Sequence, residues 1–424
     1  MLGYSLSSPR TVVIVGGGIV GLSAAWYARR DGHRVIVVER GSPDRDGCSL
    51  GNSGLVVPSH VIPLASPGAI RVALRSLFNP SSPLRLHPRL DAEYLRWCWL
   101  FCRNANEEHV RRSAPALRDI ALLSKNCYEE LTQAWGNRFH FTQQGLLMLC
   151  ATTHGFEEEA STAEFASRLG IPAEVLDARA AAALEPGIDM AIAGAVRYPL
   201  DSHLAPQLFV PELTRQLEAS GVELRWSTET RGWRTTGDRV TALLAADGEI
   251  AGDEFVLAAG SWSGEIARTL GMRLPMQAGK GYNLTLQQPR VLPRMSSILL
   301  EARIAVTPMG STLRFAGTLQ LAGLDGSIDP RRVQAIVDAI PRYYPQFSAA
   351  DFKGVKPWSG LRPCSPDGMP YIGRTRRYSN LIIASGHAMM GMSLGPGTGL
   401  LVSDLVERRQ PSMSLDRFDP DRFA

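Results

Sequence analysis

The chain has 424 residues, of which 45% are hydrophobic and 20% are charged. This composition predicts a large buried core and excludes a disordered chain, a fibrous repeat and a small disulfide-stapled module. The formal net charge is only +4, and the basic residues do not gather in a run, so a nucleic-acid partner is not expected. The six cysteines lack the paired spacing of a zinc or iron–sulfur site, so no metal is expected.

The N-terminus, MLGYSLSSPR, lacks the apolar core of a signal peptide. No window reaches the about 18 continuous apolar residues of a membrane span. We therefore expect a cytoplasmic protein. A peripheral contact with the inner face of the cell membrane stays open, because an apolar helix is expected near 90–102, with Trp97, Trp99 and Phe101 on it.

The first predicted unit is a strand over 11–15, a glycine-rich turn, a helix over 19–31 and a second strand over 33–40. Gly16 permits the tight turn, Gly18 lets a pyrophosphate approach the backbone, and Gly21 lets the helix pack close to the strand. Glu39 ends the second strand, where a carboxylate can accept from ribose hydroxyls. The unit predicts a dinucleotide with a free 2′-hydroxyl, and the glycines alone leave FAD and NAD open.

The later elements alternate between helical and strand-like patterns. A proline- and serine-rich stretch over 58–89 predicts loops. A turn over 395–399 is expected to precede the last helix and to present the positive end of its dipole to a reduced cofactor. The remaining predictions are helices within 90–135, 204–220 and 330–340, strands within 139–152, 240–260, 281–318 and 381–386, and a final helix from about 397.

Six motifs occur in order along nearly the whole chain: GGGIVG at 16–21 with Glu39 and Arg40, SLGNSG at 49–54, VLAAGSWS at 256–263, GKGY at 279–282, WSGLRP at 358–363 with PDGMPYIG at 366–373, and GHAMMG at 386–391. With these motifs the chain resembles the FAD-dependent amine and amino-acid oxidoreductases of the D-amino-acid oxidase superfamily. Within it, the chain is similar to bacterial D-amino-acid dehydrogenases and glycine oxidase-like enzymes. The segment 50–68 is similar to enzymes that oxidise 4-hydroxy-D-proline.

The resemblance implies FAD as the cofactor and an α/β fold. We expect a Rossmann-like FAD-binding domain, formed by 1–60, 195–265 and 355–424. It is interleaved with an α+β substrate domain on a largely antiparallel sheet, formed by 61–194 and 266–354. The expected FAD contacts are Gly16, Gly17, Gly18, Ile19, Val20, Gly21, Glu39, Arg40, Ser49, Gly51, Asn52, Ser53, Gly54, Leu55, Ala259, Gly260, Trp262, Gly360, Arg362, His387, Gly391, Met392 and Ser393.

Three residues are the catalytic candidates: Arg362, Tyr282 and His387. Arg362 matches the arginine that pairs with the substrate carboxylate in glycine oxidase-like members, and arginine can do so with two hydrogen bonds. Tyr282 could bind substrate or fill the core, and His387 could contact the flavin or be structural. Lys280 and His60 are weaker candidates. Between Gly386 and Gly391 the chain lacks the additional arginine of glycine oxidase-like members, which argues against that activity.

The expected reaction is oxidation of a D-amino acid, such as D-proline or 4-hydroxy-D-proline, by hydride transfer to the flavin. The expected partners are the amino acid and an electron acceptor other than NAD, namely a quinone, the respiratory chain or an artificial dye. Two alternatives stay open: an oxygen-using glycine or sarcosine oxidase-like enzyme, and the flavoprotein subunit of a hetero-oligomeric amine dehydrogenase. A plain NAD-binding module is a further rival.

Overall fold

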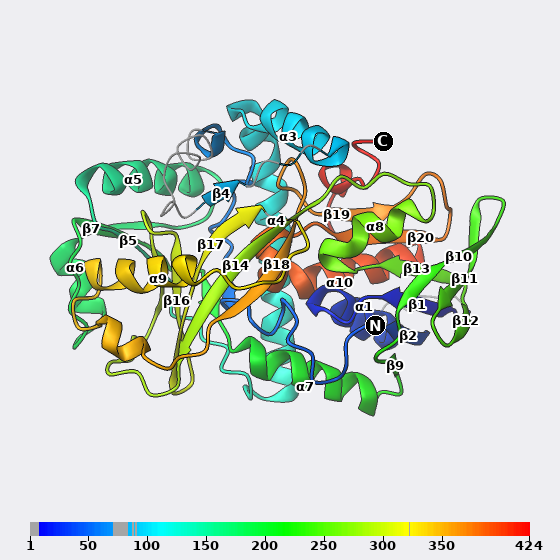
Figure 1. The fold of residues 1–424 in the computed structure, drawn as a ribbon, viewed down its shortest axis with the longest axis horizontal. Helices are drawn as coiled ribbons and strands as arrows, with labels where there is room; N and C mark the ends of the chain where they lie inside the picture. The colour runs from blue at the N-terminus through cyan, green and yellow to red at the C-terminus, as the bar shows by residue number, and fades with distance from the viewer. Residues whose placement is uncertain (1–7, 71–83, 87–88, 90, 322) are drawn as a thin grey trace.

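The computed structural model describes residues 8–70, 84–86, 89, 91–321 and 323–424. Two large sheets organise these residues, one of six strands and one of nine. Figure 1 shows the six-stranded sheet with helices α1 and α10 in one half of the molecule and the nine-stranded sheet in the other. This mixed arrangement of parallel and antiparallel sheets agrees with the predicted α/β fold.

The six-stranded sheet is parallel except at one edge, where β19 runs antiparallel to β20. β1 carries the β-branched run TVVIV, whose last four residues are buried, as expected for a strand covered on both faces. The strand order in this sheet is β19 (Tyr371–Arg374), β20 (Leu381–Ser385), β13 (Glu254–Leu257), β1 (Thr11–Val15), β2 (Arg34–Val38) and β9 (Glu223–Arg225). Segments from three distant parts of the chain therefore build one sheet.

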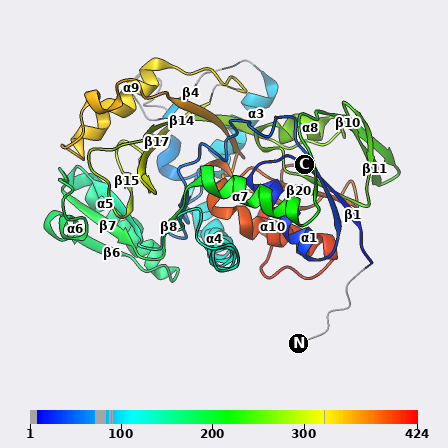
Figure 2. The same ribbon diagram turned by 90° about the horizontal axis from the view of Figure 1, so that it is seen from below.

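Helices α1 (Ile19–Arg30) and α10 (Gly391–Glu407) pack against each other beside this sheet (Figure 2). α10 begins at Gly391, so the predicted turn over 395–399 and the predicted helix start at 397 are wrong. The small residues at 395–399 let α10 pack closely on α1, since a Cβ on Gly399 would lie 2.5 Å from the backbone of Ser23. Pro396 is tolerated in the helix because the carbonyl of Met392 accepts from Tyr128 Oη at 2.6 Å.

The nine-stranded sheet is largely antiparallel, and its parallel pairs are β15 with β5 and β17 with β4. Side chains of this sheet form one apolar cluster with residues of α9. In order, the strands are β18 (Trp358–Cys364), β14 (Gln277–Leu286), β17 (Thr312–Leu321), β16 (Ile304–Met309), β15 (Ser296–Leu299), β5 (Leu146–Cys150), β7 (Gly194–Tyr198) and β6 (Glu174–Asp177), with β4 (Leu84–Leu86) paired to β17.

The remaining elements cover and connect the two sheets. The strands are β3 (Leu55–Val56) paired with β8 (Ser202–His203), and the small sheet β10 (Thr230–Thr236), β11 (Arg239–Ala245) and β12 (Gly248–Ala251). The helices are α3 (Ala92–Asn104), α4 (Glu107–Trp135), α5 (Thr153–Arg168), α6 (Ala178–Leu184), α7 (Pro206–Ala219), α8 (Ser263–Arg268), α9 (Pro330–Ala339) and the short 3-10 turns η1 (Gly260–Trp262), η2 (Ile340–Arg342), η3 (Ala349–Phe352), η4 (Ala388–Met390) and η5 (Asp416–Phe418).

The predicted domain boundaries stay predictions. β18 and most of β7 lie in segments assigned to the FAD-binding domain, yet both strands pair within the nine-stranded sheet. Residues 1–7, 71–83, 87–88 and 90 of the first predicted segments, and part of the proline-rich stretch, lie outside the described residues.

Candidate active site

The turn between β1 and α1 is built by glycines that approach other backbone closely. Gly16 has a φ of +115°, and a Cβ there would lie 2.4 Å from the carbonyl oxygen of Ala258. A Cβ on Gly21 would lie 1.9 Å from the carbonyl oxygen of Gly16. At Gly18 an added Cβ would meet only Ser49 Oγ, at 3.5 Å, so this glycine faces open space. The close approach at Gly16 and Gly21 and the space at Gly18 are compatible with the predicted roles, and the contact of Gly18 with a pyrophosphate stays a prediction.

Glu39 lies beside this turn, at the carboxyl end of β2. Its two carboxylate oxygens accept the backbone N–H groups of Gly17 and Gly41, each at 2.7 Å. At the start of α1, Ser49 Oγ accepts the N–H of Ile19 at 2.9 Å. The predicted acid and the predicted serine loop therefore meet at one helix N-terminus, which is a favourable place for phosphate groups.

The turn after β13 closes the same edge of the sheet. The guanidinium of Arg40 lies 3.7 Å from the ring centre of Trp262, which brings two predicted cofactor residues together. Ser385 Oγ accepts from Ser263 Oγ at 2.9 Å and donates to the carbonyl of Gly260 at 3.1 Å. The ends of β13 and β20 are thus tied at the carboxyl edge of the parallel strands, where ligands bind in such sheets.

The loop 49–55 is held by side chains of the nine-stranded sheet that sequence reasoning missed. Asn283 Nδ2 donates to the carbonyl of Gly51 at 2.7 Å. Arg314 Nη1 donates to the carbonyls of Leu50 and Asn52, at 3.0 and 2.6 Å. Three successive carbonyls are therefore fixed from the other sheet. No motif marks Asn283 or Arg314, because only the register of β14 and β17 brings them to this loop.

A small cavity of about 40 Å³ lies between this loop and the edge of the nine-stranded sheet. It brings together six predicted residues, namely Gly51, Asn52, Ser53, Tyr282, Gly360 and Arg362. It also includes Cys48, Trp358 and Met389, of which the last two lie in the motifs at 358–363 and 386–391, and Ala316, which no motif marks. Trp358 packs on two of the glycines, since a Cβ on Gly51 or Gly360 would lie 2.2 or 2.1 Å from its ring. Its Nε1 donates to Asp46 Oδ1 at 2.5 Å.

Arg362 is the one cationic side chain among the described residues that line this cavity. Its Nη1 donates to the carbonyl of Thr318 at 2.6 Å. Within the described part of the chain, no carboxylate forms an ion pair with it. Burial lowers the pKa of its guanidinium below the usual value, although arginine stays charged at neutral pH. A charge in such surroundings favours an anionic ligand.

The other two catalytic candidates differ in position. Tyr282 lines the cavity, but its hydroxyl donates to Gln320 Oε1 at 2.9 Å. His387 is buried outside the cavity lining, where its Nε2 lies 2.9 Å from Thr398 Oγ1 on α10. Burial lowers the pKa of His387 to about 3, so its imidazole is neutral at neutral pH. A catalytic role for either residue stays a prediction.

The weaker candidates also have structural partners. Lys280 Nζ donates to Asp325 Oδ2 at 2.9 Å and to the carbonyl of Ser327 at 2.7 Å. His60 Nδ1 lies 3.1 Å from Ser59 Oγ, and burial lowers the pKa of His60 to about 4. Neither residue lines the cavity.

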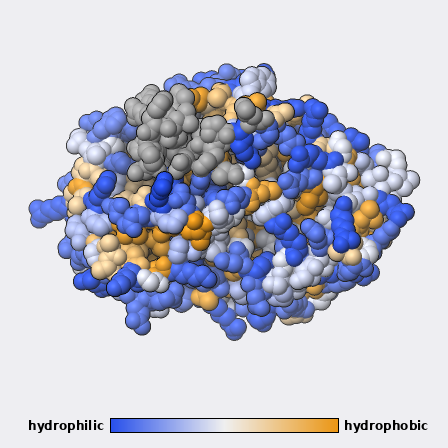
Figure 3. All heavy atoms as spheres, viewed as in Figure 1, coloured by the Kyte–Doolittle hydropathy of each residue, from blue (hydrophilic) through white to orange (hydrophobic). Residues whose placement is uncertain are grey.

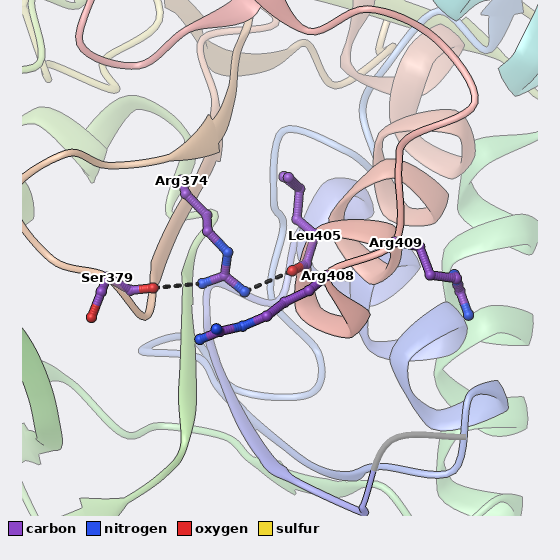
Figure 4. Close-up of a pocket in the computed structure, with 5 residues that line it drawn as sticks. All are labelled: Arg374, Ser379, Leu405, Arg408 and Arg409. Atoms are coloured by element: carbon purple, nitrogen blue, oxygen red, sulfur yellow. Dashed lines mark hydrogen bonds between the residues drawn. The ribbon is translucent and has the colours of Figure 1, made fainter. Parts of the chain in front are cut away.

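A larger hollow of about 350 Å³ is lined by Arg374, Ser379, Leu405, Arg408 and Arg409 (Figure 4). It lies at the C-terminal end of α10, whose 17 residues span about 25 Å, whereas the first cavity lies near the N-terminal end. Arg374 donates to the carbonyl of Leu405 and to Glu254, and Arg409 pairs with Asp31 and Asp404. These two arginines neutralise a helix end and nearby acids.

Comparison with known proteins decides the family. The model of the family DAO, FAD dependent oxidoreductase, matches residues 11–405. The chain belongs to this family. D-amino acid dehydrogenases from Methylobacterium radiotolerans and Granulibacter bethesdensis are 33% and 32% identical to it. The matches cover 97% and 95% of this chain and 99% and 97% of those proteins.

Solved structures of other proteins show the same fold. Glycine oxidase from Geobacillus kaustophilus has a TM-score of 0.78 at 23% identity, covering 99% of this chain and 100% of that one. L-proline dehydrogenase from P. horikoshii has a TM-score of 0.74 at 18% identity, covering 99% and 98%. L-amino acid deaminase from Proteus myxofaciens, in complex with anthranilate, has a TM-score of 0.74 at 16% identity, covering 100% and 95%.

The family membership confirms the predicted class of enzyme and its cofactor, FAD. The structure fits this cofactor: Gly18 leaves room beside the N-terminus of α1, and Glu39 lies at the end of β2. The individual cofactor contacts stay predictions.

Val57 N–H donates to Ser393 Oγ at 2.9 Å, which joins the loop after Leu55 to the predicted segment Gly391, Met392 and Ser393 at the start of α10.

The surface gives limited information about further partners. Among the described residues, no helix combines the length and apolarity needed to cross a membrane. On α3, Leu95 and Trp99 are more than half exposed, whereas Trp97 is buried and stacks on Phe101. On the face shown in Figure 3, hydrophobic residues form separate patches between hydrophilic ones. The predicted peripheral membrane contact stays a prediction.

Proposed function

We propose that this enzyme dehydrogenates a D-amino acid to the imino acid and passes the electrons to an acceptor other than NAD. The observation that carries the proposal is Arg362, a cation without a carboxylate partner among the described residues, in a cavity beside the predicted flavin loop. A substrate carboxylate would pair with it through two charge-assisted hydrogen bonds. The D-configuration rests on the relatives named D-amino acid dehydrogenase, which match over nearly the full length.

The residues of the chain bind and orient the substrate. Bound FAD supplies the acceptor for the hydride that leaves the α-carbon. Arg362 would fix the carboxylate and so restrict the direction of the α-C–H bond, which lowers the entropic barrier. The nitrogen lone pair forms the C=N bond as the hydride leaves, so the amine must be neutral. Among the described residues, no acid lines the cavity, so no carboxylate there stabilises an ammonium.

The cavity walls favour one carboxylate and an apolar side chain. Ala316, Trp358 and Met389 give the walls apolar surface, and Arg362 gives them one positive charge. This combination suits a monocarboxylic amino acid. Within that class we propose D-proline or 4-hydroxy-D-proline, on the strength of the resemblance over 50–68.

Met389 also bears on the oxidase alternative. It lines the cavity within the segment 386–391, where glycine oxidase-like members carry an additional arginine. A methionine there gives apolar contact instead of a second charge. This favours a substrate larger than glycine over a glycine or sarcosine oxidase-like activity.

The test is anaerobic bleaching of the bound flavin by a panel of D- and L-amino acids that includes both forms of proline. We expect bleaching by D-amino acids, and reoxidation faster with a quinone or dye than with oxygen. Bleaching by L-amino acids alone would contradict the D-configuration, and fast reoxidation by oxygen would favour the oxidase. A flavin that no amino acid bleaches, with small subunits co-purifying, would favour a hetero-oligomer subunit.

Binding can be measured without turnover. Anthranilate, which is bound in the L-amino acid deaminase neighbour, carries a carboxylate beside an amine. Anthranilamide has nearly the same shape without the negative charge. We expect anthranilate to perturb the flavin spectrum at lower concentration than the amide, and equal affinity would contradict carboxylate capture.

A further inference from the structure

A β-bulge lies between β14 and β17, directly behind Arg362. Lys280 pairs with Gln320, but Tyr282 pairs with Gly317, so β17 carries one extra residue over this stretch. Thr318 lies in the bulge with a φ of +63°. A β-branched residue in this left-handed region is an outlier. Bulges of this kind redirect groups next to active sites.

The strained backbone of Thr318 has a visible consequence. Its carbonyl oxygen accepts the Nη1–H of Arg362 at 2.6 Å. Its own hydroxyl is buried and has no hydrogen-bond partner among the described residues. The hydroxyl therefore does not account for the conformation, whereas the contact from the carbonyl to Arg362 makes use of it.

Gly281, on the facing strand, supplies space for the same guanidinium. A Cβ added to Gly281 would lie 2.2 Å from Nη2, 2.4 Å from Cζ and 2.9 Å from Nε of Arg362. These three atoms show that the face of the guanidinium covers Gly281. Gly281 is not among the residues with positive φ, so close approach rather than backbone freedom requires a glycine here.

We propose that Gly281 and Thr318 are positioning residues that form a seat for Arg362. Gly281 lets the guanidinium lie flat against the backbone of β14, and the carbonyl of Thr318 accepts the hydrogen bond from Nη1. The edge formed by Nε and Nη2 is then directed to the substrate carboxylate. This inference rests on the proposed function, because it explains how the anchor is oriented.

The experiment measures binding of anthranilate and anthranilamide to flavin-loaded protein, by titration of the flavin absorption. We expect Gly281→Ala to weaken anthranilate binding by about tenfold or more, as for a lost charge-assisted contact, with little effect on anthranilamide. The matched control is Gly279→Ala on the same strand. Its Cβ would lie 2.5 Å from Leu319 and 2.9 Å from Cys364 Sγ, which disturbs packing without touching the Arg362 side chain. A loss of the same size in the control would overturn the seat.

A second pair of variants tests Thr318. Proline cannot adopt a positive φ, so Thr318→Pro must turn the carbonyl away from Arg362. Glycine can adopt it, so Thr318→Gly should bind anthranilate at least fivefold more tightly than Thr318→Pro. Equal binding by the two variants would overturn the role of the left-handed backbone.

The double variant Gly281→Ala with Arg362→Ala separates the seat from the anchor. If Gly281 acts through Arg362, the double variant binds anthranilate no more weakly than Arg362→Ala alone. Additive losses of anthranilate affinity would overturn the role of Gly281 but leave Arg362 as the anchor. The same conclusion would follow if Arg362→Ala lost affinity and Gly281→Ala did not. If Arg362→Ala itself binds anthranilate like the wild type, the proposed carboxylate anchor is wrong, and the inference that rests on it is wrong too.

Discussion

The cofactor turn and the seat of Arg362 both depend on glycines that leave no room for a Cβ, but they are built differently. In the turn, Gly21 approaches the carbonyl of Gly16, five residues earlier in the chain. In the seat, Gly281 approaches the side chain of Arg362 and Thr318 supplies the carbonyl, so three strands contribute. The glycines of the first region lie close together between 16 and 21, whereas the second region exists only when β14, β17 and β18 pair.

This difference explains why one region has a recognisable pattern and the other does not. A local turn must repeat the same residue types at the same spacing wherever it occurs. A seat assembled from three strands has no fixed spacing, because loops of any length can join them. Variants that remove one contact at a time can test how independent the two regions are.

The largest effect is expected for Gly21→Ala. Its Cβ would lie 1.9 Å from a backbone oxygen, so α1 must move away from β1. We expect loss of bound FAD and a lower Tm, measured by the flavin absorbance of purified protein and by thermal unfolding. The contrasting variant is Gly18→Ala, which meets open space and should fold normally while binding FAD more weakly. Full FAD content in Gly21→Ala would contradict the close packing.

The second largest effect is expected for Arg362→Ala. We expect kcat/KM for the amino acid to fall by about 100-fold or more, since it removes one side of a buried charge pair. Arg362 is also one of the expected FAD contacts, but FAD content should be retained, because the contacts that form the cofactor turn do not involve it. Arg362→Lys keeps the charge but loses the planar fork, so its kcat/KM should lie between those of the wild type and Arg362→Ala. Steady-state kinetics on FAD-loaded protein checks this, and normal turnover of Arg362→Ala would contradict the anchor.

Arg314→Ala tests whether the two regions are coupled. Arg314 belongs to the nine-stranded sheet but fixes the carbonyls of Leu50 and Asn52. We expect FAD affinity to fall by about tenfold, as for loss of charge-assisted hydrogen bonds. The control is Arg290→Ala, which removes an exposed arginine paired with Asp351. FAD titration of the apoproteins measures the effect, and equal affinities would show that the loop holds its shape without Arg314.

The smallest effect is expected outside both regions, at Glu159. Burial raises the pKa of this carboxyl to about 7, and Tyr198 donates to it at 2.8 Å. Because the folded pKa lies above the unfolded one, the stability that the protonated carboxyl contributes is full below the unfolded pKa of about 4.5 and is lost as pH rises from there to about 7.

Glu159→Gln mimics the protonated form. We expect it to match the wild type at about pH 4, where the carboxyl is protonated in both states, and to exceed it by about 1–2 kcal/mol in free energy of unfolding at pH 8. Urea unfolding at the two pH values checks this. FAD and anthranilate binding should not change, and a variant less stable than the wild type at pH 8 would contradict the raised pKa.

The sequence predicted the parts of the site that follow from local pattern. The glycines at 16, 18 and 21 lie as expected, and Gly51, Asn52, Ser53, Gly360 and Arg362 meet at one cavity. The predicted start of α10 was wrong. Small residues at 395–399 are typical of a turn, whereas in the folded protein they let α10 pack on α1. His387 faces Thr398 rather than the cavity, which follows from the path of the chain into α10.

By itself, the sequence determined the fold class, the cofactor and the family, because each depends on short patterns that keep their order along the chain. Only the tertiary structure decided what surrounds Arg362. Among the described residues no carboxylate pairs with it, and its surroundings are the apolar walls of Trp358 and Met389 and the carbonyl of Thr318, all from segments far apart in sequence. The physical reason is strand pairing: register places side chains next to each other without requiring any fixed spacing between them.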